Sequence, residues 1–182
     1  MNAFYFFPMT IILIPVLIFL IFLLLLIILT FFFLAIDVFL DLPYVATERF
    51  KIDTIFKFAQ IKKGETVIDL GSGDGRLLFA AAAGGAKAVG YEINPFMVII
   101  SRIHASLKGL AENIRIYKKN LWQADLKVAD VIFVYGRRKT MQKFEDFVFK
   151  NAKKGTRIVV NTNPFPNKKP IKSEKGLFLY KV

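Results

Sequence analysis

The sequence predicts an α/β domain with a doubly wound, mostly parallel β-sheet, preceded by one transmembrane helix. Short apolar runs alternate with helix-forming segments from residue 66 to residue 161, which is typical of a parallel sheet with helices on both faces. Residues 3–36 contain no charged side chain, whereas the rest of the chain is strongly basic. We therefore expect two parts, a membrane anchor at residues 1–41 and a domain at residues 42–182.

Length and composition exclude several kinds of protein. The 182 residues leave room for one soluble domain beside the anchor, but not for a two-domain enzyme. The chain has no cysteine and one histidine, which excludes disulfides and cysteine-based zinc sites and argues against a histidine-rich metal site. We therefore expect no metal cofactor.

The first segment has the length and composition of a membrane span. Thr30 is the only polar residue between positions 11 and 36, and a hydrocarbon core about 30 Å thick requires roughly 20 apolar helical residues. A cleaved signal peptide would have a basic start, a shorter apolar core and a small-residue cleavage site, which this segment lacks. Basic residues follow the span, beginning with Arg49 and Lys51, so we expect a single-pass membrane protein whose domain faces the cytoplasm.

The domain itself is basic. All 26 Lys and Arg residues lie in residues 49–182 together with eleven of the 14 acids, so this segment has a formal charge of +15. Such a surface is attracted either to anionic lipid headgroups or to nucleic acid. The basic residues are dispersed and no base-reading motif accompanies them, so we expect the lipid bilayer to be the partner and do not expect nucleic acid.

The first elements of the domain follow the anchor in order. Residues 42–45 are expected to be extended, because the residue before Pro43 avoids the helical conformation. Apolar residues recur with a helical period over residues 47–60, and Lys62-Lys63-Gly64 ends this helix. Residues 66–70 are rich in β-branched side chains and should form a strand. A glycine loop and an alanine-rich helix should follow at residues 71–75 and 76–83.

The alternation continues toward the C-terminus. Further strands are expected at residues 86–91, 113–117, 130–135 and 156–161, with helices at residues 95–108 and 140–150. Residues 163–167 should form a turn, and residues 177–182 a last, antiparallel strand. Residues 163–166 (N-P-F-P) resemble the N-P-P-[YF] box of methyltransferases that act on nucleobase amines, but they follow the fifth strand instead of the fourth. We therefore expect a turn near the substrate channel.

The glycine loop is the candidate ligand site. In doubly wound sheets the ligand binds at the carboxyl ends of the strands, where the strand order reverses. Residues 69–75 read D-L-G-S-G-D-G, and the three glycines permit positive φ and let a ligand approach the backbone. Glu92 lies at the end of the second strand, where a carboxylate can accept hydrogen bonds from both hydroxyls of an adenosine ribose.

The charges around this loop separate two cofactor classes. A nicotinamide site uses G-x-G-x-x-G to seat a pyrophosphate on a helix N-terminus, and the third position of that pattern is Arg76 here. Asp69 and Asp74 would repel a pyrophosphate but suit a ligand with an ammonium and a sulfonium. The pattern D-x-G-x-G-x-G followed by Glu92 therefore predicts an S-adenosylmethionine site, the alternative being a glycine turn in an inert domain.

These motifs resemble those of the seven-strand, Rossmann-like (class I) methyltransferases. A narrower resemblance adds Pro43-Tyr44-Val45, residues 90–95 and Phe165-Pro166. Together they are similar to the mitochondrial lysine methyltransferases that modify the c subunit of ATP synthase and the adenine nucleotide translocase, and to their prokaryotic relatives. That family also has a hydrophobic segment before a small methyltransferase domain. The resemblance covers residues 43 to about 166.

The resemblance implies a set of cofactor-binding residues. They are Tyr44, Thr47, Asp69, Gly71, Ser72, Gly73, Gly75, Glu92, Asn120 and Leu121. Asp69 and the loop glycines would line the methionine moiety and Glu92 the ribose. Asn120 and Leu121 fall where relatives hold the adenine, while Tyr44 and Thr47 would close over the cofactor. Trp122 would either cover the adenine ring or belong to the core.

The implied function is a membrane-anchored protein-lysine N-methyltransferase that uses S-adenosylmethionine and acts on a membrane protein. Tyr44, Tyr135 and Asn163 are candidates to orient the substrate amine, and no single residue is identified as a catalytic base. Two alternatives stay open. The acceptor could be a lipid or quinone headgroup, or the domain could bind the cofactor without catalysis and act as a membrane-surface module.

Overall fold

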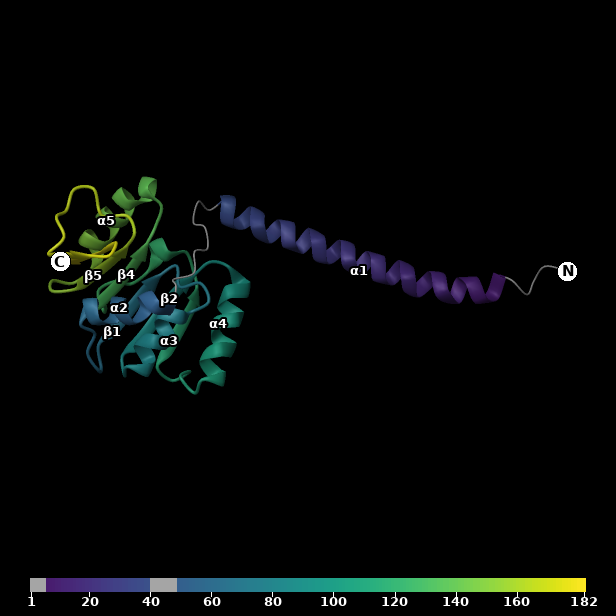
Figure 1. Ribbon diagram of the computed structural model, residues 1–182, viewed down its shortest axis with the longest axis horizontal. Coiled ribbons are helices and arrows are strands. Elements are labelled where there is room, and N and C mark those ends of the chain that lie inside the picture. Colours follow the sequence, from purple (N-terminus) through teal and green to yellow (C-terminus); the bar gives the residue numbers. More distant parts are fainter. Residues whose placement is uncertain (1–5, 40–48) are drawn as a thin grey trace. The chain divides into compact units, whose positions relative to one another are not determined.

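The computed structural model describes residues 6–39 and 49–182, and the side chains of residues 12–32, 52 and 54–182 (Figure 1). The chain divides into two compact units, residues 1–43 and residues 44–182. The first contains the helix α1 (Phe6–Phe39), in which the segment Ile12–Phe32 has a mean hydropathy of 3.6 and exposed side chains. Its 21 residues are enough to cross a membrane by length and composition.

The second unit is built on a seven-stranded sheet, which confirms the predicted fold class. The strands are β1 (Thr66–Leu70), β2 (Lys87–Glu92), β3 (Ile114–Lys118), β4 (Val131–Tyr135), β5 (Arg157–Asn161), β6 (Lys172–Glu174) and β7 (Leu177–Lys181). Their order is β3-β2-β1-β4-β5-β7-β6, in which the first five are parallel and β7 runs antiparallel to both neighbours. The strand order reverses between β1 and β4, so the carboxyl ends of these strands mark the expected ligand site.

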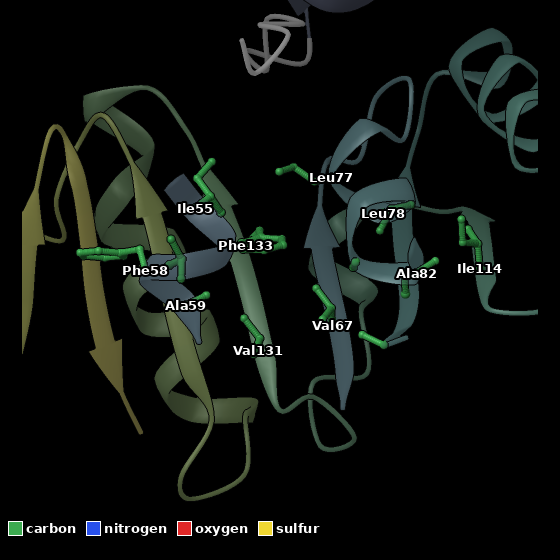
Figure 2. Packing of buried hydrophobic residues seen from close by; sticks show 14 of the residues in the cluster. Ile55, Phe58, Ala59, Val67, Leu77, Leu78, Ala82, Ile114, Val131 and Phe133 are labelled. Carbon is green, nitrogen blue, oxygen red and sulfur yellow. The ribbon is translucent and has the colours of Figure 1, made fainter. Parts of the chain in front are cut away.

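Helices cover both faces of this sheet. They are α2 (Arg49–Ala59), α3 (Arg76–Ala83), α4 (Pro95–Leu107) and α5 (Met141–Asn151), with short 3₁₀ turns η1 (Leu121–Gln123) and η2 (Arg138–Thr140). Figure 2 shows apolar side chains of α2 and α3 packed against β4 and β1, with Val67 and Phe133 at the centre. Successive side chains of a strand point to opposite faces, so Ile68 and Ile132 lie on the other face of the sheet, where they are fully buried. Helix α5 contributes the buried side chains of Phe144 and Val148 to that face.

Within the described residues the predicted elements agree with the structure to within one or two residues at each end, apart from one strand, and the extended segment predicted at residues 42–45 lies outside the described residues. The three residues of β6 (Lys-Ser-Glu) are all exposed, so no apolar pattern in the sequence indicates this strand. Its hydrogen-bonding partner is β7, which directly follows Lys175 and Gly176, both at positive φ. The start of the predicted helix 47–60 lies outside the described residues, and the described part ends at Ala59.

Arg157 on β5 fastens the end of α2 to the sheet. Its guanidinium donates hydrogen bonds to the carbonyls of Ala59 (2.8 Å) and Gln60 (2.6 Å). It also forms a 2.5 Å ion pair with Glu65, and both side chains are mostly buried. The helix C-terminus therefore has charged donors for its last carbonyls, a favourable arrangement for the helix dipole.

Replacing this arginine should destabilise the domain. We expect Arg157→Met to lower the free energy of unfolding by about 2–3 kcal/mol, because the Ala59 carbonyl and the Glu65 carboxylate lose a charged donor. Urea unfolding followed by the fluorescence of Trp122, the only tryptophan, measures this change. Lys153→Met is the control, since it removes a more exposed ion pair with Asp130 and should cost less than about 1 kcal/mol. Equal losses in both variants would contradict a special role for Arg157.

Candidate functional site

The loop between β1 and α3 is folded by its three glycines. Gly71, Gly73 and Gly75 all have positive φ, at 95°, 52° and 83°. The backbone N–H groups of Gly71 and Ser72 donate to the carbonyl of Tyr91 at 2.9 and 3.1 Å, which holds the loop against the end of β2. The chain therefore turns sharply from the carboxyl end of β1 into α3, and Gly71 is exposed at this end of the strand.

The loop lies so close to β2 that only glycine fits at position 90. A Cβ atom on Gly90 would lie 2.5 Å from the Ser72 hydroxyl oxygen and 2.6 Å from a methyl carbon of Leu78. Ser72 itself is buried, and its hydroxyl has no hydrogen-bond partner in the described part of the chain. No pattern in the sequence indicates this packing role of Gly90, although the glycine belongs to the stretch that carries the family resemblance.

Glu92 connects the loop with the beginning of α4. One carboxylate oxygen accepts from the N–H of Gly73 and the other from the N–H of Asn94, both at 2.8 Å. Asn94 in turn caps α4, since its side-chain oxygen accepts from the N–H of Phe96 at 3.0 Å. Each Glu92 oxygen has a further lone pair available. The carboxylate can therefore hold the loop and still accept hydrogen bonds from two ligand hydroxyls.

Asp69 gives the site its electrostatic character. Its side chain is buried at the end of β1, and burial, together with the nearby charges of Glu92 and Asp74, raises its pKa to about 8. Asp74 is compensated by Arg76, whose guanidinium contacts it at 2.5–3.1 Å. No cationic side chain among residues 54–182 offsets the raised pKa of Asp69, so a ligand that brings positive charge would favour its ionised form.

The residues expected near the adenine divide into two groups. Leu121 is buried, and one of its methyl carbons lies 3.9 Å from the position that a Cβ on Gly71 would occupy, so it borders the loop. Asn120 is exposed and uses its side-chain oxygen to accept from the N–H of Trp122 at 3.1 Å. The Trp122 ring packs against Phe144, with ring centroids 4.6 Å apart, which identifies this residue as part of the packing of α5.

Two of the three residues predicted to orient the substrate amine, Tyr135 and Asn163, lie near each other at the carboxyl ends of β4 and β5. Tyr135 ends β4 and is paired in register with Asn161 at the end of β5. The side-chain amide of Asn163 donates to the carbonyl of Gly136 at 2.8 Å, which brings the segment after β5 beside the end of β4. Thr162, between Asn161 and Asn163 in the chain, has a φ of 74°, an unusual conformation for a β-branched residue. Tyr44 and Thr47 lie outside the described residues.

Comparison with known proteins gives consistent matches. The model of the ANTKMT methyltransferase domain family matches residues 69–172. The lysine N-methyltransferase of the ATP synthase c-subunit from Xenopus laevis is 34% identical over 128 residues, which cover 70% of this chain and 56% of that protein. Adenine nucleotide translocase lysine N-methyltransferase of Mus musculus is 31% identical over 133 residues, covering 72% and 58% of the two chains.

A solved structure matches over a similar extent. The crystal structure of an RNA methyltransferase from Salinibacter ruber in complex with S-adenosyl-L-homocysteine has a TM-score of 0.69 and 29% identity, covering 75% of this chain and 91% of that one. The chain spans just over half the length of the curated relatives that it matches. These findings confirm the predicted resemblance and, with it, S-adenosylmethionine as the cofactor. Because the family model covers more than half of the sequence, the chain belongs to the ANTKMT methyltransferase domain family.

Proposed function

We propose that the protein is a membrane-anchored S-adenosylmethionine-dependent methyltransferase that methylates a lysine side chain of a membrane protein. The observation that carries the proposal is the arrangement at the carboxyl end of β1, where a glycine loop held by Glu92 adjoins the buried, uncompensated Asp69. This arrangement combines an acceptor for ribose hydroxyls with a site for positive charge. The ribose acceptor suits any adenosine cofactor, and the site for positive charge distinguishes S-adenosylmethionine from a dinucleotide.

The residues present fit this cofactor. Glu92 would bind the ribose hydroxyls, Asp69 and the loop glycines would surround the methionine moiety, and Leu121 would pack against the adenine. The hydroxyl of Ser72, within the loop, is buried and has no hydrogen-bond partner among the described residues. When bound, the cofactor supplies a methyl group on a positively charged sulfur.

The protein's own contribution to transfer would be positioning. An attacking amine must be neutral and aligned with the methyl group, and a held geometry accounts for much of the rate acceleration in such reactions. Tyr135 and Asn163 lie at the carboxyl ends of β4 and β5, and the glycine loop follows the carboxyl end of the parallel strand β1. We assign them, with Tyr44, to orienting the amine by accepting hydrogen bonds from it.

Family membership and the first segment support the choice of substrate. The relatives are named for lysines of the ATP synthase c-subunit and of the adenine nucleotide translocase. Helix α1 is long and apolar enough to hold the domain, taken as residues 42–182, at a bilayer, and Arg49, Lys51 and Lys57 after it favour a cytoplasmic domain. Such tethering raises the effective concentration of membrane-embedded substrates near the site.

One observation favours a second acceptor. The matched Salinibacter ruber structure is that of an RNA methyltransferase, and the domain carries a formal charge of +15. To distinguish a protein lysine from RNA as the methyl acceptor, the full-length protein is incubated with methyl-labelled S-adenosylmethionine, host membranes and host RNA. Label in a protein band that yields methyl-lysine on hydrolysis supports the proposal. Label in RNA, or in an organic extract of lipids and quinones, overturns the lysine assignment.

Removing the Glu92 carboxylate should weaken cofactor binding. We expect Glu92→Ala to raise the dissociation constant about 100-fold, because the ribose hydroxyls lose two hydrogen bonds to a charged acceptor. Glu92→Gln retains one acceptor oxygen and should lose less. Calorimetric titration with S-adenosyl-L-homocysteine measures both, and Glu112→Ala, in an exposed turn, is the control. An unchanged affinity in Glu92→Ala would refute the ribose assignment.

The raised pKa of Asp69 predicts a pH dependence of cofactor binding. With a pKa of about 8, Asp69 is mostly protonated at pH 6.5 in the free protein, and a cationic ligand favours its ionised form. Binding should therefore release close to one proton, and affinity should rise as the pH increases from 5.5 to about 7.5, where the ligand's amino group is still charged. Calorimetry in buffers of different ionisation enthalpy measures this proton release.

Asp69→Asn is the matched variant for this test. The amide is isosteric but cannot ionise, so proton release should disappear and the affinity should no longer rise over the same pH range. Persistent proton release in Asp69→Asn would show that another group titrates on binding.

A further inference from the structure

Helix α4 is apolar on two opposite faces. One face is buried against the sheet through Val98, Ser101 and Ala105. The opposite face carries Ile99, Ile100, Ile103 and Leu107, whose side chains are between 38% and 79% exposed. With 3.6 residues per turn, these four positions lie within an arc of about 100°, so they form one continuous stripe along the helix.

Basic side chains border this stripe. Arg102 and Lys108 lie on the two sides of it on the helical wheel, and both are exposed. Residues 95–119, which contain α4 and the edge strand β3, include five Lys or Arg residues and one acid, Glu112. An apolar stripe with basic borders is the pattern of helices that lie in the interface of an anionic membrane.

The connection to α1 keeps α4 within reach of a bilayer. Nine residues separate Phe39 at the end of α1 from Arg49 at the start of α2. Even fully extended, these ten Cα steps cover no more than about 36 Å. If α1 spans the membrane, the domain cannot move far from the lipid surface, whatever its orientation.

We propose that α4 is an interfacial membrane-contact helix whose stripe, Ile99, Ile100, Ile103 and Leu107, inserts into the headgroup region of an anionic bilayer. A second copy of the chain is a less suitable occupant. Four side chains of one helix bury much less than the roughly 1,200 Å² of a stable dimer, and the basic borders of two copies would repel each other.

This contact would also orient the candidate site. Helix α4 begins at Pro95, three residues after Glu92, and its N-terminal cap Asn94 donates its N–H to the Glu92 carboxylate. An interfacial helix lies in the plane of the membrane surface, so docking α4 along its length would also bring its N-terminal end, and the glycine loop that Glu92 connects to it, near the lipid surface. The inference rests on the proposed membrane span only for keeping the domain near the bilayer.

The absence of native cysteine permits a direct test. Single-cysteine variants of the full chain are labelled with an environment-sensitive fluorophore and reconstituted into vesicles of phosphatidylcholine with phosphatidylglycerol. Ile103→Cys reports on the stripe, Leu20→Cys on α1, and Ser173→Cys on the exposed strand β6 at the opposite edge of the sheet. Nitroxide lipids measure contact with the bilayer, aqueous iodide measures contact with water, and cofactor binding verifies the fold of each variant.

We expect the label at position 103 to be quenched by nitroxide lipid and protected from iodide, and the label at position 173 to behave in the opposite way. Contact at position 103 should weaken in vesicles of phosphatidylcholine alone, because the basic borders lose their anionic partners. Iodide quenching at position 103 equal to that at position 173 would overturn the proposal, and so would protection from both quenchers, which would indicate a protein contact instead. The label at position 20 tests the membrane span separately, so failure of the anchor and failure of the α4 contact give different results.

Discussion

The carboxylate of Glu92 is the interaction on which the rest of the site depends. It accepts from the N–H of Gly73 in the loop and from the N–H of Asn94 at the start of α4, and thereby connects three elements that meet at the end of β2. These hydrogen bonds form only because the loop approaches β2 closely, which in turn requires Gly90. The residue proposed to bind ribose therefore also maintains the shape of the site, so cofactor binding and loop conformation should be coupled.

Charge explains why this glycine loop suits a cationic ligand. The loop N–H groups of a dinucleotide site meet a pyrophosphate, and three acidic residues would oppose that anion here. Of these, Asp74 is paired with Arg76 and Glu92 accepts hydrogen bonds from two backbone N–H groups, which leaves Asp69 buried with a raised pKa. A buried carboxyl of this kind is held protonated until a positive charge arrives. The selectivity thus comes from the one acid of the loop that the described part of the fold does not compensate.

The strands and the site loop could be predicted from the sequence because they depend on local patterns. β-Branched runs indicate β1, β4 and β5, and the spacing of glycines with Asp69 and Glu92 indicates the cofactor class. Features set by tertiary packing could not be predicted in this way. β6 consists of three exposed polar residues, Gly90 is required by a neighbouring loop, and the packing of Trp122 against Phe144 depends on where α5 lies.

The role of helix α4 also could not be predicted from the sequence. Its sequence is apolar around most of the circumference, a composition that fits either a buried core helix or a membrane-associated helix. The structure removes this ambiguity for one face only: Val98, Ser101 and Ala105 pack on the sheet, and the isoleucine stripe does not. A soluble domain could replace those isoleucines with polar residues at a smaller cost than core residues, because they are only partly buried within the domain, with 38–53% of their surface exposed. Their presence is therefore better explained by a contact outside the domain than by folding, and the basic borders of the stripe favour lipid as that contact.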